Sequence, residues 1–220
     1  AAKLDRHRGL EIGAATVEAL RVEAGIPRFG AELDERVMPA EGGIVERAVS
    51  SLQSGRTRYA PGQGELVARS AVARHLTRRS GWSVSPDDIV TVAGTQNGLY
   101  LAMTLLAEPG DDVLVPDPHY ATYDGVVAAT GARFVAVPTR PEDGFHLRAE
   151  ALEAAITPGT RVLLLNSPAN PTGAVLGPEE IDAIGEVCRR HELWIVADEV
   201  YADLTLDGAF ASPYDRPALR

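Results

Sequence analysis

Apolar and polar positions follow a regular alternation of two patterns from about residue 64 onward. Residues 64–81 carry apolar side chains at helical spacing and end at Gly81, a residue that commonly terminates a helix. The same spacing predicts helices over residues 96–110, 120–131, 147–156 and 178–191. Short apolar runs between them predict strands over residues 88–94, 111–117, 132–138, 160–168 and 193–201.

The predicted strands are continuous apolar runs such as DVLVP and RVLLL, with no alternation of polar and apolar positions. Runs of this kind are typical of strands that are buried on both faces. Strands that alternate with helices indicate right-handed crossover connections and a parallel sheet. We therefore expect an α/β protein with a mostly parallel sheet flanked by helices and preceded by an N-terminal arm.

Unusual residues follow four of the predicted strands. In sheets of this class, ligands bind outside the carboxyl ends of the strands. We expect the four groups to share one rim of the sheet. They are Gly94-Thr95-Gln96-Asn97, Asp117-Pro118-His119-Tyr120, residues 166–173 and Asp198-Glu199-Val200-Tyr201.

Gly94, Thr95 and Gln96 open a predicted helix. The free N–H groups and the positive end of the helix dipole make such a start a binding site for an anion. Glycine allows close approach of the backbone, and the threonine hydroxyl adds a donor. The same residues are also typical of an ordinary strand–turn–helix connection with a capping threonine.

The remaining rim residues suit a flat, charged ring. Asp198 ends an apolar strand, where a carboxylate needs a cationic partner such as a protonated pyridine nitrogen, or else caps the next turn. Tyr201 lies three residues further on, and Asn170 offers both a donor and an acceptor. Tyr120 either stacks on the ring or packs as a half-buried side chain.

Composition narrows the class of partner. The net charge of −10 over 220 residues, with no basic cluster, argues against a nucleic-acid surface. One cysteine, Cys188, excludes an intrachain disulfide and fits a reducing compartment. Residues 1–13 lack the apolar core of a signal peptide, and no stretch has the about 20 apolar residues of a membrane span. We interpret the protein as cytoplasmic, with no membrane partner.

Other ligand classes find little support. No G-x-G-x-x-G follows the first predicted strand, which argues against a dinucleotide-binding dehydrogenase. His75, His119 and His191 do not have metal-ligand spacing with one another, so we predict no metal site.

Four segments of the chain resemble the fold-type I pyridoxal-phosphate aminotransferases of class I/II, the aspartate aminotransferase-like kind. They are RYAPGQGELVARSAVARHL, VAGTQNGLYLAMTLLAEPGDDVLVPDPHYATY, LLLNSPANPTG and VADEVYADL, in the order and spacing of that family. The resemblance covers residues 44–220. It implies an incomplete large domain of the pyridoxal-phosphate transferase fold, the cofactor pyridoxal 5′-phosphate, and transamination between an L-amino acid and a 2-oxo acid.

The resemblance assigns a role to each rim residue. Residues 94–96 match the cradle for the cofactor phosphate, and Tyr120 matches the aromatic residue stacked on the pyridine ring. Asn170 and Tyr201 match the pair that binds the phenolic oxygen of the ring. Asp198 matches the carboxylate paired with the ring nitrogen, and we expect Asp198 and Tyr201 to take part in catalysis.

Tyr59 extends the expected site to a second subunit. It lies in RYAPGQGEL, a turn with one proline and two glycines. In the resemblance, Tyr59 matches a tyrosine that reaches the cofactor phosphate of the neighbouring subunit. We therefore expect a homodimer whose sites are built from both chains.

Two features depart from the family pattern. The Schiff-base lysine of the family lies farther beyond the DEVY motif than this sequence extends, and the one lysine here is Lys3. We expect a truncated aminotransferase that lacks the residue for covalent attachment.

The stretch beginning DPHYATY resembles arginine–pyruvate-type members. A C–S lyase or β-eliminase of the same fold, and a non-catalytic binding protein, remain as alternatives.

The second departure is the start of the chain. Residues 9–49 resemble a segment of the glycine-cleavage T-protein, an aminomethyltransferase, although no folate-binding motif is evident. The segment is either foreign, in a chimera, or a family arm that has diverged, and we favour the former. We therefore divide the chain into an arm or foreign segment, 1–43, and a partial transferase domain, 44–220.

Overall fold

The computed structural model describes residues 42–205, 210–216 and 219, and the chain divides into two compact units, Ala1–Tyr59 and Ala60–Arg220. In the first unit the described helix is α2 (Gly42–Gln53), whose Val45, Val49 and Leu52 are exposed. The sequence-based division between residues 43 and 44 stays a prediction.

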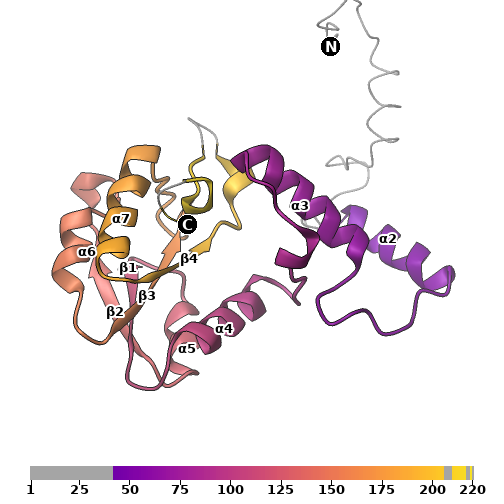
Figure 1. The fold of residues 1–220 in the computed structure, drawn as a ribbon, viewed down its shortest axis with the longest axis horizontal. Helices are drawn as coiled ribbons and strands as arrows, with labels where there is room; N and C mark the ends of the chain where they lie inside the picture. The colour runs from indigo at the N-terminus through magenta and orange to yellow at the C-terminus, as the bar shows by residue number, and fades with distance from the viewer. Residues whose placement is uncertain (1–41, 206–209, 217–218, 220) are drawn as a thin grey trace, which may run out of the picture. The chain divides into compact units, whose positions relative to one another are not determined.

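The second unit is built on a parallel sheet of four strands in the order β2-β1-β3-β4 (Figure 1). The strands are β1 (Asp112–Asp117), β2 (Arg133–Pro138), β3 (Thr160–Asn166) and β4 (Trp194–Asp198). The helices are α3 (Leu66–Ser80), α4 (Thr95–Leu106), α5 (Tyr123–Ala128), α6 (Ala149–Ala155) and α7 (Pro178–Arg190). This architecture confirms the predicted α/β class.

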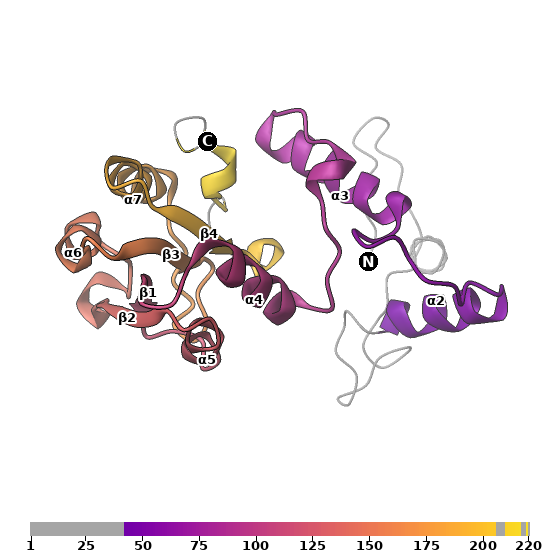
Figure 2. The same ribbon diagram turned by 60° about the horizontal axis from the view of Figure 1, so that its bottom comes forward.

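Side chains of the two inner strands alternate between two apolar cores, one on each face of the sheet. Leu114, Leu163 and Leu165 pack with residues of α6 and α7. Val113 and Val162 point the other way and pack with residues of α4 and α5. Figures 1 and 2 show the same division, with α6 and α7 covering one face and α4 and α5 covering the other. Continuous apolar strands are therefore required.

The outer strands differ from the inner ones. As predicted, residues 112–115 of β1 are buried, and so are residues 160–165 of β3 except Arg161. The residues of β2 and β4 are largely half-buried or exposed. Trp194 at the start of β4, for example, is 61% exposed. The prediction of burial on both faces is wrong for β2 and β4, because within the described residues each has a neighbouring strand on one side only.

The strand predicted over residues 88–94 is wrong. Asp88 ends a short 3₁₀ helix (η1, Pro86–Asp88), and the residues after it join no sheet. The Thr91 N–H donates to the carbonyl oxygen of Gln63 at 2.9 Å, and Val90 is largely exposed. A β-ladder needs a neighbouring strand to satisfy its backbone groups, and the apolar pattern alone does not provide one.

Helix ends follow the local signals more closely. Gly81 adopts a left-handed conformation, and its N–H donates to the Thr77 carbonyl at 3.0 Å, which ends α3 as predicted. By contrast, α5 is shorter than predicted, because Tyr120 to Thr122 form the turn that precedes it. Among the described residues, no helix has both the length and the apolar character needed to cross a bilayer. The other 3₁₀ helices are η2 (Pro141–Asp143), η3 (Ala202–Leu204) and η4 (Pro213–Asp215).

Candidate active site

Polar residues gather at the carboxyl end of the sheet. Asp117, Asn166 and Asp198 are the last residues of β1, β3 and β4, and Asn166 lies beside Asp198 in the β3–β4 register. Parallel strands bring these ends to one rim, as the sequence predicts. The Gly94 group reaches the same rim from the start of α4, without a strand before it.

Asp198 is a buried carboxylate held by two donors. Its side chain lies at the end of β4, and the residue is 6% exposed. The Tyr123 hydroxyl donates to Oδ2 at 2.7 Å, and the Val200 N–H donates to Oδ1 at 3.1 Å. Hydrogen bonds of this kind compensate a buried carboxylate and fix its orientation.

Tyr123 is a site residue that the sequence analysis missed. It begins α5, its side chain is 2% exposed, and it belongs to the α4–α5 core. Burial, followed by the hydrogen bond to Asp198, raises the pKa of Tyr123 above the ordinary value, so the hydroxyl stays a donor. Its position in the sequence, three residues after Tyr120, is the signal that could have indicated this role.

The loop after β3 is tied to β4 by a chain of hydrogen bonds. The Asn166 amide nitrogen donates to the Asp198 carbonyl at 2.9 Å, and its amide oxygen accepts from the Asn170 N–H at 2.7 Å. The Asn170 amide nitrogen donates to the Tyr201 hydroxyl at 3.3 Å. The predicted pair Asn170 and Tyr201 is therefore brought together, and Asn166 is a further residue that the sequence analysis did not single out.

The start of α4 is a glycine in an unusual conformation. Gly94 has φ 87° and ψ 161°, a region that is essentially restricted to glycine. Thr95 and Gln96 follow as the first residues of a helix of 12 residues, whose N-terminal N–H groups are directed away from the helix. The Gln96 amide oxygen accepts from the Thr122 hydroxyl at 3.0 Å, which joins this turn to the start of α5.

Six of the eight predicted site residues line one hollow of about 200 Å³. They are Thr95, Gln96, Tyr120, Asn170, Asp198 and Tyr201, together with Tyr123, Asn166 and Val200. The Tyr120 ring is partly exposed and meets the edge of the Tyr123 ring, with centroids 5.7 Å apart and planes inclined at 74°. The hollow thus combines a carboxylate, amide and hydroxyl groups, an aromatic ring and a helix N-terminus.

The two other predicted residues lie outside this lining. Gly94 precedes it as the N-cap of α4. Tyr59 is the last residue of the first unit, and its side chain is fully exposed. Its predicted contact with a neighbouring subunit stays a prediction.

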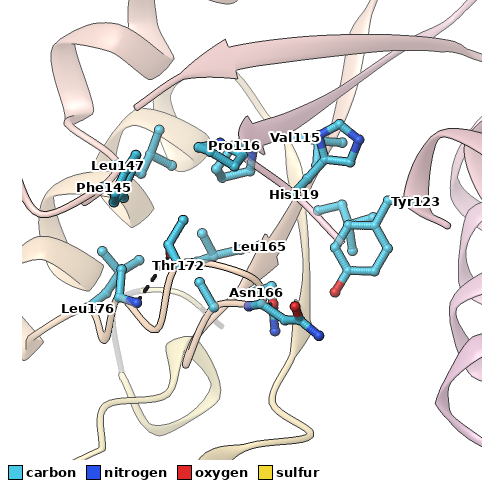
Figure 3. Close-up of a pocket in the computed structure, with 15 residues that line it drawn as sticks. Val115, Pro116, His119, Tyr123, Phe145, Leu147, Leu165, Asn166, Thr172 and Leu176 are labelled. Carbon is cyan, nitrogen blue, oxygen red and sulfur yellow. Dashed lines mark hydrogen bonds between the residues drawn. The ribbon is translucent and has the colours of Figure 1, made fainter. Parts of the chain in front are cut away.

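A narrow apolar slot of about 30 Å³ adjoins the hollow between the ends of β1 and β3 (Figure 3). Leu147, Leu165 and Leu176 lie along it, and Figure 3 shows the Tyr123 hydroxyl directed toward the side where Asn166 lies. Tyr123 and Asn166 line both spaces, so they form part of the wall between the polar hollow and this apolar slot.

The residue after Asp198 belongs to an ion cluster with α3. Arg79 lies 3.3 Å from a Glu199 carboxylate oxygen and 3.0 Å from Asp215, and its guanidinium lies 5.5 Å from the Phe210 ring centroid. The Ser212 hydroxyl also donates to Glu199. Burial raises the pKa of Glu199, against the opposing effects of Ser212 and Arg79. The cluster fixes the chain directly beyond the rim.

Comparison with known proteins identifies the family. The family model of class I and II aminotransferases matches residues 21–218. The solved structure of the Thermus thermophilus aspartate aminotransferase with maleate has a TM-score of 0.74 and 36% identity, over 90% of this chain and 52% of that chain. The fold and the rim therefore define a pyridoxal-phosphate transferase of fold type I. Within that class, the chain belongs to the class I and II aminotransferases.

Curated relatives are named as aminotransferases. Arginine–pyruvate transaminase AruH of Pseudomonas aeruginosa is 44% identical over 176 residues, which are 80% of this chain and 45% of that protein. The probable aspartate/prephenate aminotransferase of Thermus aquaticus is 35% identical over 206 residues, or 94% of this chain and 51% of that protein. The chain spans about half the length of these relatives.

The family match also bears on the start of the chain. It begins at residue 21, within the segment that the sequence analysis treated as an arm or foreign piece. The resemblance of residues 9–49 to the glycine-cleavage T-protein is not shown by these matches, and most of that segment lies outside the described residues.

The residues present fit the cofactor of this family, pyridoxal 5′-phosphate. Asp198 offers a buried, oriented carboxylate for the ring nitrogen, and the Asn170–Tyr201 pair offers hydrogen bonds for the phenolic oxygen. The α4 N-terminus at Gly94 suits a phosphate, because free N–H groups and the helix dipole both favour an anion.

Proposed function

We propose that this chain carries the cofactor site of a pyridoxal-phosphate-dependent aminotransferase, which transfers the amino group of an L-amino acid to a 2-oxo acid. The observation that carries the proposal is the Asp198 carboxylate, fixed by the Tyr123 hydroxyl and the Val200 N–H at the wall of a hollow that includes the α4 N-terminus. One hollow thus offers a negative carboxylate for the ring nitrogen and the positive end of a helix for the phosphate.

Each residue has a definite task in this proposal. Asp198 keeps a proton on the ring nitrogen, since a buried carboxylate favours a cationic partner. The bound cofactor then supplies an electron-withdrawing ring that stabilises negative charge on the substrate. Asn170 and Tyr201 orient the phenolic oxygen, residues 94–96 hold the phosphate, and Tyr120 covers a ring face. Asp198 and Tyr201 are the residues that we assign to catalysis.

For the substrate pair, we propose L-arginine and pyruvate. The support is the 44% identity to a protein named arginine–pyruvate transaminase. Aspartate is the alternative amino donor, supported by the relatives named aspartate aminotransferases.

For the assembly, we propose a homodimer in which Tyr59 contacts the cofactor phosphate of the neighbouring subunit. A tyrosine with a fully exposed side chain on a turn rich in glycine and proline supports this role. We propose the cytoplasm as the compartment, because the single cysteine, Cys188, is buried and unpaired and suits a reducing environment.

Binding of pyridoxamine 5′-phosphate tests the site directly, because this amino form of the cofactor needs no covalent bond to the protein. Calorimetric titration of the chain should show binding that Asp198→Asn weakens about a hundredfold, through loss of a buried charge pair. Asp203→Asn changes an exposed carboxylate in the next turn and serves as the matched control. Absence of binding, or equal binding by Asp198→Asn, would overturn the proposal.

A product assay then separates the reaction types. A form of the protein that also carries the Schiff-base lysine of the family, supplied with the cofactor, should convert pyruvate to alanine in the presence of L-arginine. Release of pyruvate, ammonia and a thiol from a cysteine thioether, without alanine formation, would assign the protein to β-elimination instead.

A further inference from the structure

Asn166 joins two loops of the rim through opposite atoms of one side-chain amide. Its Nδ2 donates to the main-chain carbonyl of Asp198 at 2.9 Å, and its Oδ1 accepts from the Asn170 N–H at 2.7 Å. Only an amide supplies a donor and an acceptor in this arrangement, so neither a carboxylate nor an apolar side chain of the same shape makes both bonds.

We propose that Asn166 is a positioning residue that holds Asn170 at a fixed place relative to Asp198. It thereby sets the separation between the two residues that bind the two sides of the cofactor ring. The inference rests on the proposed function and deepens it. In the proposed function, Asp198 binds the ring nitrogen and Asn170 binds the phenolic oxygen. The separation between these two residues therefore decides whether both contacts form on one rigid ring.

The two ends of the bridge are not equally dependent on Asn166. The Asp198 carbonyl also accepts from the Ser167 N–H at 3.3 Å, and Asp198 is further fixed by the β3–β4 pairing. Its carboxylate is held separately by Tyr123. The Asp198 side of the hollow therefore keeps its position when Asn166 is replaced.

Asn170 depends on Asn166 much more strongly. It lies beyond the end of β3, in a loop whose own backbone bonds run from the Ala169 N–H to the Ala174 carbonyl and from the Gly173 N–H to the Ala169 carbonyl. These bonds close the loop on itself and do not attach it to β4. The described attachments of Asn170 to the rest of the rim are its N–H bond to Asn166 and its side-chain bond to Tyr201.

This asymmetry predicts which ligand contact is lost. We expect Asn166→Leu, which keeps the branched shape and removes both hydrogen bonds, to weaken the contact with the phenolic oxygen and to spare the contact with the ring nitrogen. The measurement is calorimetric titration with pyridoxamine 5′-phosphate, with its 3-deoxy analogue, which lacks the phenolic hydroxyl, and with its 1-deaza analogue, which lacks the ring nitrogen.

The parent chain should prefer pyridoxamine 5′-phosphate over both analogues. In Asn166→Leu the preference over the 3-deoxy analogue should fall about tenfold, the value of one well-placed hydrogen bond. The preference over the 1-deaza analogue should be unchanged. A merely structural role for Asn166 would weaken all three ligands alike and leave both preferences as they are in the parent.

Asn166→Asp is the matched variant, because it keeps an oxygen that accepts from the Asn170 N–H. It should retain the preference over the 3-deoxy analogue, and hydrogen exchange at the Asn170 amide should stay slow, whereas exchange becomes faster in Asn166→Leu. Should Asn166→Leu fail to fold, Asn166→Ser, whose side chain is too short to reach both partners, carries the same prediction.

The outcomes separate this inference from the proposed function. If the parent chain does not bind pyridoxamine 5′-phosphate, the cofactor site and this inference fail together. If the parent binds it and the 3-deoxy preference survives in Asn166→Leu and Asn166→Ser, the role of Asn166 is refuted while the cofactor site stands.

Discussion

The Tyr123 hydroxyl lies 2.7 Å from a carboxylate oxygen of Asp198, although the two residues are 75 positions apart in the chain. One residue begins a helix on one face of the sheet, and the other ends a strand. The contact forms because α5 begins at the rim, where β4 ends in Asp198. It gives Asp198 a neutral donor whose proton is retained, since burial raises the pKa of Tyr123.

The first prediction concerns this pair. Tyr123→Phe keeps the buried ring and removes the donor, so Asp198 loses its orientation toward the ring nitrogen. Pyridoxamine 5′-phosphate should bind about tenfold more weakly, whereas its 1-deaza analogue should bind as it does to the parent. Tyr120→Phe is the control, because it removes a hydroxyl of the same hollow without touching Asp198, and should not change the ratio of the two affinities. A loss shared equally by both ligands in Tyr123→Phe would reduce Tyr123 to a packing residue.

The second prediction concerns Gly94, whose φ of 87° and ψ of 161° are strained for any residue with a Cβ atom. Gly94→Ala should lower the free energy of unfolding by about 2 kcal/mol, the cost of holding alanine in this conformation. Gly125→Ala is the control, since an added Cβ meets nothing within 4 Å on helix α5 and alanine favours a helix. Urea titrations of both variants measure the difference, and equal stabilities would contradict it.

The third prediction concerns Arg79, which lies between Glu199 and Asp215. Arg79→Met should destabilise the fold by about 2 kcal/mol at pH 8, because the largely buried Glu199 carboxylate loses its cation. Burial already raises the pKa of Glu199, and loss of the cation raises it further. As the pH falls, Glu199 takes up a proton in the folded state, so the deficit should shrink toward pH 5.

Adding Glu199→Gln to Arg79→Met provides the control for that prediction. The double variant should recover part of the lost stability at pH 8 and show little dependence on pH. A deficit that stays constant between pH 5 and pH 8 would show that Arg79 acts through packing, for example on Phe210, and not through its charge.

The fourth prediction concerns acid unfolding. Burial alone would raise the pKa of Glu180, but hydrogen bonds from the Gly177 N–H at 2.8 Å and from His146 hold it below the ordinary value of 4.5. A carboxyl group with a lowered pKa in the folded state stabilises the protein above the pKa of the unfolded state. That contribution is lost as the pH falls through the folded-state pKa.

Glu180→Gln tests this assignment. The variant should be about 1 kcal/mol less stable at pH 7, the value of a helix cap, and the difference should shrink below about pH 4.5. Glu179→Gln lies beside it at the start of α7 and serves as the control. If the two variants show the same pH profile, the cap does not depend on the Glu180 charge.

The sequence by itself determined the fold class and most of the rim. Apolar runs such as DVLVP and RVLLL are short-range features of the chain. Because successive side chains of a strand point to opposite faces, such runs require helices on both sides of the sheet. Because parallel strands end at the same edge, the positions of Asn170 and Asp198 after their strands were enough to place them together. The motifs around these residues further indicated the family.

The tertiary structure decided which strands pair and which distant residues contact one another. Residues 88–94 have a strand-like sequence, yet they join no sheet in the described chain, because a strand exists only where a second strand supplies its hydrogen bonds. The half-burial of β2 and β4 likewise depends on their outer places in the strand order. The bonds of Tyr123 and Asn166 to Asp198 link residues that are distant in sequence. Such contacts depend on how helices and strands pack against one another, and no local pattern of side chains encodes that packing.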